Sequence, residues 1–223
     1  MRLTIKAALG ALALCAAGQA QAMPIVLDFE GLGDVEPVEE FYNGGLGGFG
    51  SGPGPDFDIS FGPNALAAID ADAGGTGNFG GEPSPDTTMA FLTGSAVLNV
   101  PNGFDIGFSF FYSAIQLPGT VTVFDGLNAT GNVLATIPLA LTPLNGAPDP
   151  TGQFSPFVPI GVSFPGIAFS IDFGGTANRI GFDNITFGSA TPGGATPVPE
   201  PAAMLLFGVG LAGIAALRRR RRC

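Results

Sequence analysis

The chain has 223 residues, of which 46% are hydrophobic and 12% charged, and it contains neither histidine nor tryptophan. Charge is placed unevenly, because residues 23–197 hold 17 acidic side chains and one basic side chain, Arg179, for a net charge near −16. Nucleic acids and anionic membranes are poor partners for such a body, since phosphate binding depends on clustered Lys and Arg. Cations are suitable partners.

Residues 1–22 have the three parts of a secretory signal peptide. A basic start with Arg2 and Lys6 precedes a short apolar run, and an A-x-A site follows at Ala20 and Ala22. The run is too short to span a bilayer, which takes about 20 apolar residues. We therefore expect export and cleavage by signal peptidase after Ala22.

Residues 23–188 are predicted to form an antiparallel β-sandwich ectodomain with a jelly-roll-like arrangement. Apolar residues recur at every second position in several segments, which indicates half-buried strands, and Gly, Pro, Asn or Asp separates most segments. Short, regularly spaced strands with glycine-rich turns are typical of sandwiches. The expected strands lie near residues 25–29, 57–61, 64–69, 88–92, 95–100, 104–112, 119–125, 132–141, 159–164, 167–173 and 179–187.

Two segments rich in Gly and Pro and the last predicted strand depart from the regular strand pattern. Residues 44–55 are rich in Gly and Pro and are predicted to be a mobile loop, and residues 189–197 to be a linker. In the last strand the apolar positions change phase at Asp183-Asn184. The change indicates either a β-bulge or a strand buried on both faces.

Residues 23–197 contain few of the side chains that enzymes use for catalysis. Residues 23–197 contain no histidine, lysine or cysteine, because Cys15 and Cys223 lie outside them. Ser-His, Cys-His and Ser-Lys nucleophiles, zinc sites with imidazole or thiolate ligands, and disulfides are therefore excluded. Paired carboxylates such as Glu39-Glu40 could serve a glycosidase, but a solvated surface or ion binding is the favoured interpretation. We predict that the protein is not an enzyme.

One segment resembles an EF-hand calcium loop. Asp70, Asp72 and Asn78 have the spacing of ligands in such a loop. Two ligand positions are occupied by Gly74 and Gly81, and no helices are predicted beside the segment. Ordinary surface carboxylates are the alternative.

The C-terminal 26 residues contain three blocks in a fixed order. The motif Val198, Pro199, Glu200, Pro201 comes first, and the apolar residues 202–217 follow as a predicted single transmembrane helix. Terminal arginines then keep that end in the cytoplasm and the body outside; they are Arg218, Arg219, Arg220, Arg221 and Arg222. An ordinary tail anchor has the same physical properties.

These three blocks resemble the PEP-CTERM sorting signal of Gram-negative bacteria. The resemblance implies that an exosortase recognises Pro199-Glu200-Pro201 and removes the tail, after an inner-membrane-anchored intermediate through residues 202–217. It also implies a final location at the cell surface or in the extracellular matrix. Residues 26–32 and 181–188 are similar to β-sandwich ectodomains that carry this tail. The domain organisation is then 1–22 signal peptide, 23–188 ectodomain, 189–197 linker and 198–223 sorting signal.

The resemblance suggests a second calcium site. Sandwich modules of the carbohydrate-binding type often hold a structural Ca²⁺ between the first and last strands, and Asp28, Glu30 and Asp183 fall where that site would be. Surface carboxylates are again the alternative.

The expected function is a non-enzymatic structural or adhesive role linked to exopolysaccharide. The first alternative is a Ca²⁺-dependent carbohydrate-binding module, although Tyr42 and Tyr112 are the only residues apart from phenylalanine that could stack on a sugar. A secreted carboxylate-dependent glycosidase is the second alternative.

Overall fold

A computed structural model describes residues 24–142, 152–175 and 177–193. These residues lie in one compact unit, Pro24–Ala195. The strands are β1 (Ile25–Leu27), β2 (Glu36–Pro37), β3 (Ser60–Phe61), β4 (Leu66–Ile69), β5 (Thr87–Ala90), β6 (Ala96–Phe104), β7 (Gly107–Ser113), β8 (Gly119–Phe124), β9 (Val133–Leu139), β10 (Val158–Ser163), β11 (Ala168–Gly174) and β12 (Gly181–Phe187).

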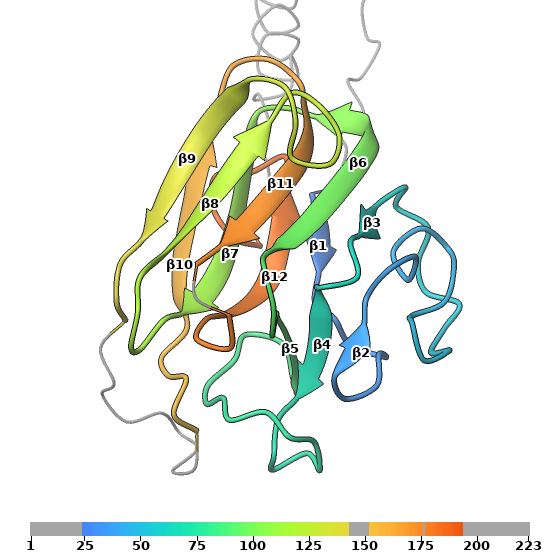
Figure 1. Cartoon of the computed structure of the whole chain (residues 1–223), viewed down its shortest axis with the longest axis vertical. Helices are drawn as coiled ribbons and strands as arrows, with labels where there is room; N and C mark the ends of the chain where they lie inside the picture. Colours follow the sequence, from blue (N-terminus) through green and yellow to red (C-terminus); the bar gives the residue numbers. More distant parts are fainter. Residues whose placement is uncertain (1–23, 143–151, 176, 194–223) are drawn as a thin grey trace, which may run out of the picture. The chain divides into compact units, whose positions relative to one another are not determined.

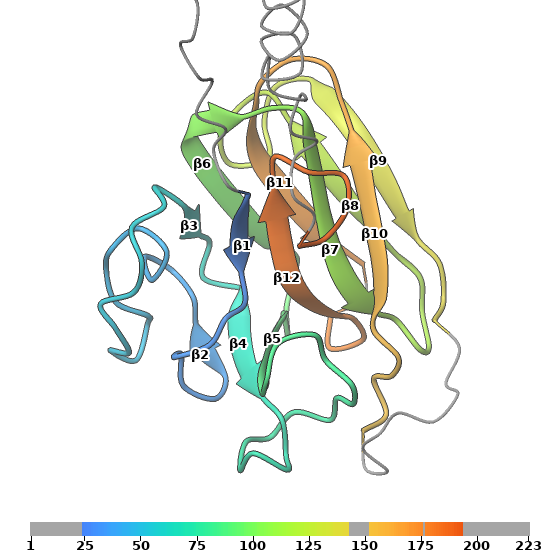
Figure 2. The same cartoon turned by 180° about the vertical axis from the view of Figure 1, so that it is seen from behind.

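The strands form two facing sheets, as Figures 1 and 2 show from opposite sides. One sheet has the order β10-β7-β12-β5-β4-β2, with β1 paired to β12, and the other has the order β3-β6-β11-β8-β9. Every pairing between these strands is antiparallel. The predicted all-β antiparallel sandwich is confirmed for the described residues, which contain no helix. The jelly-roll connectivity stays a prediction.

The signal peptide with Ala20 and Ala22, the linker beyond residue 193 and the sorting signal lie outside the described residues. The same holds for the helix expected at residues 202–217. Within the described residues, no helix is long and apolar enough to cross a membrane.

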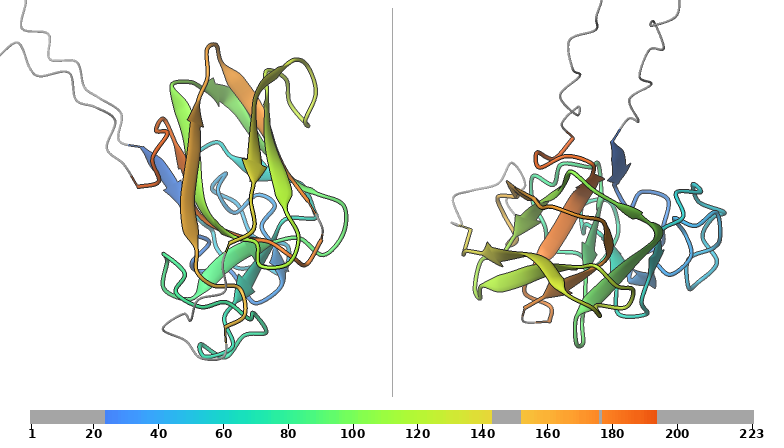
Figure 3. Two further views of the ribbon diagram at one scale, coloured as in Figure 1. Left: turned by 90° about the vertical axis from the view of Figure 1, so that its left-hand side faces the viewer. Right: turned by 90° about the horizontal axis from the view of Figure 1, so that it is seen from above.

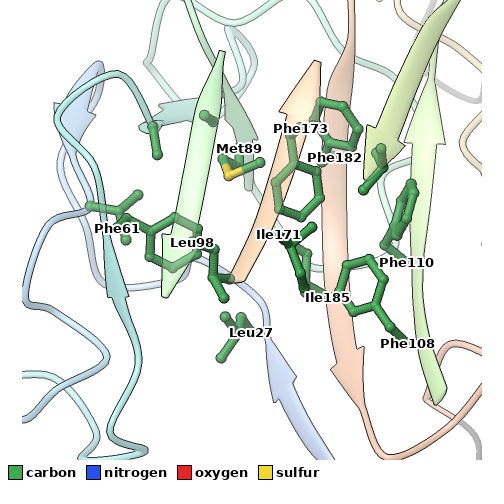
Figure 4. Packing of buried hydrophobic residues seen from close by; sticks show 14 of the residues in the cluster. Leu27, Phe61, Met89, Leu98, Phe108, Phe110, Ile171, Phe173, Phe182 and Ile185 are labelled. Carbon is green, nitrogen blue, oxygen red and sulfur yellow. The ribbon is translucent and has the colours of Figure 1, made fainter. Parts of the chain in front are cut away.

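The core between the sheets is dominated by phenylalanine (Figure 4). Phe108 and Phe110 of β7, Phe182 of β12 and Phe173 of β11 are fully buried. Phe173 packs edge-on against all three, with ring centroids 6.0, 5.8 and 5.0 Å from Phe108, Phe110 and Phe182. Edge-to-face pairs add to the free energy gained from burial, so this cluster joins the sheets without a disulfide.

All the expected strands are present, but period two does not hold along their whole length. Strict alternation from the buried residues Phe108, Ile137 and Ile171 would place Ile106, Val133 and Ile167 on the core side, yet each of these three is more than half exposed. Ile106 lies in the turn between β6 and β7 with φ of 70°. In β11 the register shifts between Ala168 and Ser170, which moves the buried side of the strand by one residue.

The last strand combines both alternatives left open by its sequence. In β12 the register against β7 shifts between Asp183 and Thr186, and Asn184 takes φ of 47°, so a bulge lies at the predicted place. Asp183 and Thr186 are nevertheless fully buried, as are Phe182 and Ile185 on the core side. Both faces of β12 are therefore covered.

Residues 44–55 form a loop, but it is hydrogen-bonded along its length. Its backbone contacts include Gly44 N–H to Pro55 O (3.1 Å) and Gly54 N–H to Gly45 O (3.0 Å). A Cβ at Gly47 would lie 2.6 Å from the Glu36 carboxylate, so this position requires glycine. The loop predicted as mobile is thus packed around one acidic side chain.

That side chain, Glu36, belongs to β2, the short strand that the sequence did not predict. Its buried carboxylate accepts hydrogen bonds from Gly33 N–H (2.5 Å), Phe49 N–H (2.9 Å), Ser51 N–H (3.0 Å) and the Ser51 hydroxyl (2.5 Å). Burial by itself would raise the pKa of Glu36, but the hydrogen bonds from Ser51, Gly33 and Phe49 outweigh it and lower the pKa to about 2.

We predict that Glu36→Gln lowers the free energy of unfolding by about 2–3 kcal/mol at pH 7, because an amide leaves some of these donors without an acceptor. The folded-state pKa is below the unfolded value, so the contribution of Glu36 is complete above about pH 4.5 and is lost as pH falls toward 2. Denaturant titrations between pH 2 and 7 measure the difference between wild type and variant.

Glu40→Gln is the matched control, since Glu40 is exposed and its side chain accepts a hydrogen bond from the Asn43 amide alone among the described residues. An equal loss in both variants, or a loss independent of pH, would contradict the role of Glu36.

Candidate functional site

The carboxylates expected to form an end-to-end site lie near one another, on the segment after β1 and on β12. Asp183 is fully buried. Its Oδ2 accepts hydrogen bonds from Ser84 N–H and from the Ser84 hydroxyl, both at 2.8 Å, and its Oδ1 accepts one from Asn184 N–H at 2.6 Å. The Ser84 hydroxyl also lies 3.1 Å from the backbone carbonyl of Asp28. Ser84 therefore joins the two ends of the domain.

The segment after β1 is held by Tyr42 and by its own turn. Phe29, with φ of 63°, donates its N–H to the Tyr42 hydroxyl at 2.6 Å. The Tyr42 hydroxyl lies 3.5 Å from Asp28 Oδ1, which also accepts Glu30 N–H at 3.3 Å. Burial first, and the nearby Asp28 charge second, raise the pKa of Tyr42, so its hydroxyl keeps its proton.

Glu30 links this segment to β5. Its Oε1 accepts hydrogen bonds from Asp86 N–H (3.0 Å) and Thr87 N–H (2.9 Å), and its Oε2 accepts one from the Thr87 hydroxyl (3.2 Å). The Glu30 charge also contributes to a raised pKa at Asp183. The three carboxylates, with Ser84, Thr87 and Tyr42, form one network, which we call the end-to-end cluster.

A buried hydroxyl without a hydrogen-bond partner lies on the same face of the sheet as Asp183. Met89 of β5 pairs with Phe182 of β12, and both side chains are in the core, so Thr88 and Asp183 point to the opposite face. Thr88 is fully buried, and its hydroxyl has no hydrogen-bond partner among the described residues.

Some features of this cluster favour Ca²⁺ and others do not. All the side-chain atoms that could coordinate a cation are oxygens, which Ca²⁺ prefers, and the nearby Thr88 hydroxyl has no hydrogen-bond partner among the described residues. The carboxylates, however, accept hydrogen bonds from the chain. Within residues 24–142, 152–175 and 177–193, no group of three acidic, histidine or cysteine side chains has a geometry that could hold a metal ion. As it stands, the cluster is a hydrogen-bonded network rather than a metal cage.

The EF-hand-like residues form a loop closed by its own hydrogen bonds. Asp70 is buried, and its Oδ1 accepts Phe79 N–H at 3.0 Å, while its backbone carbonyl accepts Gly75 N–H at 2.9 Å. Asn78 Oδ1 accepts Gln153 N–H at 3.0 Å, and Asp72 is exposed. Asp70 and Asn78 thus have structural roles in the loop.

Sequence reasoning missed the partners that join the end-to-end cluster. Ser84, Thr87 and Tyr42 lie in segments with no motif, and hydroxyl residues are too common for their spacing to identify them. The structure brings them to the carboxylates through the pairing of β1 with β12, which places the segment after β1 beside Asp183.

Comparison with protein families identifies the C-terminal signal. The family model for the PEP-CTERM protein-sorting motif matches residues 197–221. The chain therefore carries this motif at the predicted place, with Val198, Pro199, Glu200 and Pro201 inside the match. No curated protein matches the chain significantly.

Solved structures with some likeness include adhesin and carbohydrate-binding domains. The K2 cleaved adhesin domain of Lys-gingipain has 11% identity and a TM-score of 0.47, over 74% of this chain and 99% of that chain. The K1 domain of the same protein from Porphyromonas gingivalis has 14% identity and a TM-score of 0.40, over 75% and 99%. A carbohydrate-binding module of Cellvibrio mixtus lichenase 5A, in complex with cellotriose, has 14% identity and a TM-score of 0.31, over 56% and 87%. These values carry no information about ligand or activity.

We predict a pH-dependent stability that depends on Asp183. Burial is the largest cause of a pKa of Asp183 that is raised from 3.8 to about 7, and the Glu30 charge adds to it. The hydrogen bonds from Ser84 and Asn184 lower the pKa but do not offset burial. A raised pKa stabilises the fold fully below about pH 4, and this contribution is lost as pH rises through about 7. The free energy of unfolding should decrease by on the order of a few kcal/mol across this window.

Asp183→Asn should flatten this pH dependence, because the amide does not titrate. Thermal melts between pH 4 and 8 test the effect, with exposed Asp105→Asn as the control. A variant whose melting temperature follows pH as the wild type does would show that Asp183 is not responsible.

Proposed function

We propose that this protein is an exported, non-enzymatic surface protein with a structural or adhesive role in the exopolysaccharide matrix. The observation that carries the proposal is the PEP-CTERM sorting motif at residues 197–221, which follows an all-β domain. In this proposal signal peptidase releases the N-terminus, an exosortase processes the tail, and the sandwich is the part that acts outside the cell.

The placement of the two terminal strands supports this role. β1 and β12 pair side by side, with Ile25 opposite Phe187. Figure 2 labels the two strands next to each other, and Figure 3 shows the blue β1 near the orange-red C-terminal part of the domain from two further directions. Each terminal strand is thus held by the other and by the core. Removal of the segments before β1 and after residue 193 would leave these contacts intact.

The chemistry of the body supports a non-enzymatic role. Residues 23–197 supply no histidine, lysine or cysteine for a nucleophile or its base. Glu30, Glu36 and Asp183 accept hydrogen bonds that hold the fold. A secreted glycosidase, the least favoured alternative, would need two free carboxyls about 5–10 Å apart in a cleft.

We predict that protein recovered from the surface of the native host lacks the residues after roughly Pro201. Glu200→Ala should leave uncut chain in the inner membrane, because the processing enzyme reads the Pro-Glu-Pro motif. Intact-mass spectrometry of surface and membrane fractions measures both outcomes.

Thr196→Ala, just before the matched residues, is the control and should be processed normally. Surface protein that still carries Arg218 to Arg222, or normal processing of Glu200→Ala, would overturn the sorting proposal.

We also propose Ca²⁺ as a ligand of the end-to-end cluster, as the alternative of a Ca²⁺-dependent carbohydrate-binding module requires. Three features support it: the net charge near −16 of residues 23–197, the buried carboxyl of Asp183 with its raised pKa, and the Thr88 hydroxyl that has no partner among the described residues. Binding would have to replace hydrogen bonds that the carboxylates now accept. The effect of Ca²⁺ on the stability of the fold is therefore the test of this site.

We expect millimolar Ca²⁺ to raise the melting temperature above that in chelator. A ligand at a hundredfold excess over its Kd stabilises the folded state by about 2.7 kcal/mol. Mg²⁺ should do less, because it needs tighter octahedral geometry. Asp183→Asn should remove most of the gain and Asp72→Asn should not. A shift that is equal for Ca²⁺, Mg²⁺ and NaCl would reduce the effect to charge screening and discard the site.

A further inference from the structure

A cavity of about 370 Å³ lies on the outer face of the larger sheet, over β4 and β5. Its floor includes Leu66, Ala68 and Ala90. These residues alternate with Ala67 and Met89, which are fully buried in the core, so the floor faces away from the other sheet. The volume is at the lower end of the range of about 300–1,000 Å³ for small-molecule sites.

One wall of the cavity is built by two segments distant in sequence. Phe154 N–H donates to Asn78 O at 2.9 Å, and Gly80 N–H donates to Phe154 O at 3.2 Å. The rings of Phe79 and Phe154 pack with centroids 5.9 Å apart, and both residues line the cavity. The wall is therefore preformed, which reduces the entropy lost when a ligand binds.

The other wall holds the single basic residue of the ectodomain. Arg179 lines the cavity beside Asn178, whose N–H donates to Phe91 O at 2.7 Å and whose φ is 57°. No carboxylate forms an ion pair with Arg179 in the part of the chain that the structure describes, although residues 23–197 contain 17 acidic side chains. A half-buried guanidinium without a counterion inside a cavity is a site for an anion.

The other residues that line the cavity indicate which kind of anion fits beside Arg179. Gln153 and Asn178 also line the cavity, and both are exposed, so their primary amides can pair with hydroxyl groups. Phe154, which is half-buried, can contact C–H groups through its ring, whereas Phe79 is buried and supports the ring of Phe154. One guanidinium balances one negative charge, and the acidic body repels an extended polyanion. A carboxylated sugar ring has this combination of one charge, several hydroxyls and an apolar face.

We propose that this cavity, the Arg179 pocket, binds a single uronic-acid residue carried by an otherwise neutral glycan. Arg179 pairs with the carboxylate, and the amides of Gln153 and Asn178 bond the ring hydroxyls. The inference deepens the proposed surface role, on which it rests for the source of the glycan. Binding to the purified chain is measured separately from sorting, so either can fail alone.

Calorimetry on the full chain, purified in mild detergent, tests the pocket with methyl glucuronide and methyl glucoside. The two differ only by the carboxylate in place of the hydroxymethyl group. We expect the glucuronide to bind at least tenfold more tightly than the glucoside. Its affinity should fall as the salt concentration rises. Its affinity should be the same in Ca²⁺ and in chelator, which separates this pocket from cation-mediated binding at the end-to-end cluster.

Arg179→Gln should abolish the preference for the glucuronide, and Gln153→Ala should weaken binding of both sugars. Asn102→Ala, an exposed amide on β6 of the other sheet, should leave binding unchanged. Thermal melts show that each variant is folded. Equal binding of the two sugars, binding that survives Arg179→Gln, or preference for an acidic tripeptide over the glucuronide would overturn the proposal.

Discussion

Glu36 and Asp183 are fully buried carboxylates in a domain with one basic side chain, and much of the fold depends on how their charge is met. Neither forms an ion pair with a basic side chain within the described residues. Backbone N–H groups and serine hydroxyls bond both of them, and each carboxylate fixes a segment without regular structure. Glu36 organises the glycine-rich loop, and Asp183 anchors the segment that follows β1 through Ser84.

The two carboxylates differ in what burial does to them. Four hydrogen bonds more than offset burial at Glu36, so its pKa falls to about 2 and it stays charged in neutral solution. Three hydrogen bonds do not offset burial and the Glu30 charge at Asp183, so its pKa rises to about 7. The first carboxylate is a structural centre. The second is under electrostatic stress, which a proton or a cation can relieve.

The aromatic core that stabilises the sandwich lies between the sheets, and the two proposed sites are built mostly from other residues. Phenylalanine rings between the sheets supply cohesion that a disulfide supplies in many exported domains. The end-to-end cluster lies where the first and last strands meet, and the Arg179 pocket lies on the outer face of β4 and β5.

The sequence alone was enough for the sorting motif, the all-β class and the approximate positions of every strand except β2, because these depend on local composition and on period-two alternation. For Asp183-Asn184 it left a bulge and a strand buried on both faces open, and β12 has both. The grouping of Asp28, Glu30 and Asp183 came from the resemblance to sandwich modules, and the structure brings them together through the pairing of β1 with β12. Period two predicted wrong faces for Ile106, Val133 and Ile167, since register shifts and turns are set by neighbouring strands. β2 has only two residues, one of them proline, and its pairing comes from contact with β4. The roles of Glu36, Ser84 and Arg179 were decided by the tertiary structure, because their partners are distant in sequence and only the folded chain brings those atoms within hydrogen-bonding or lining distance.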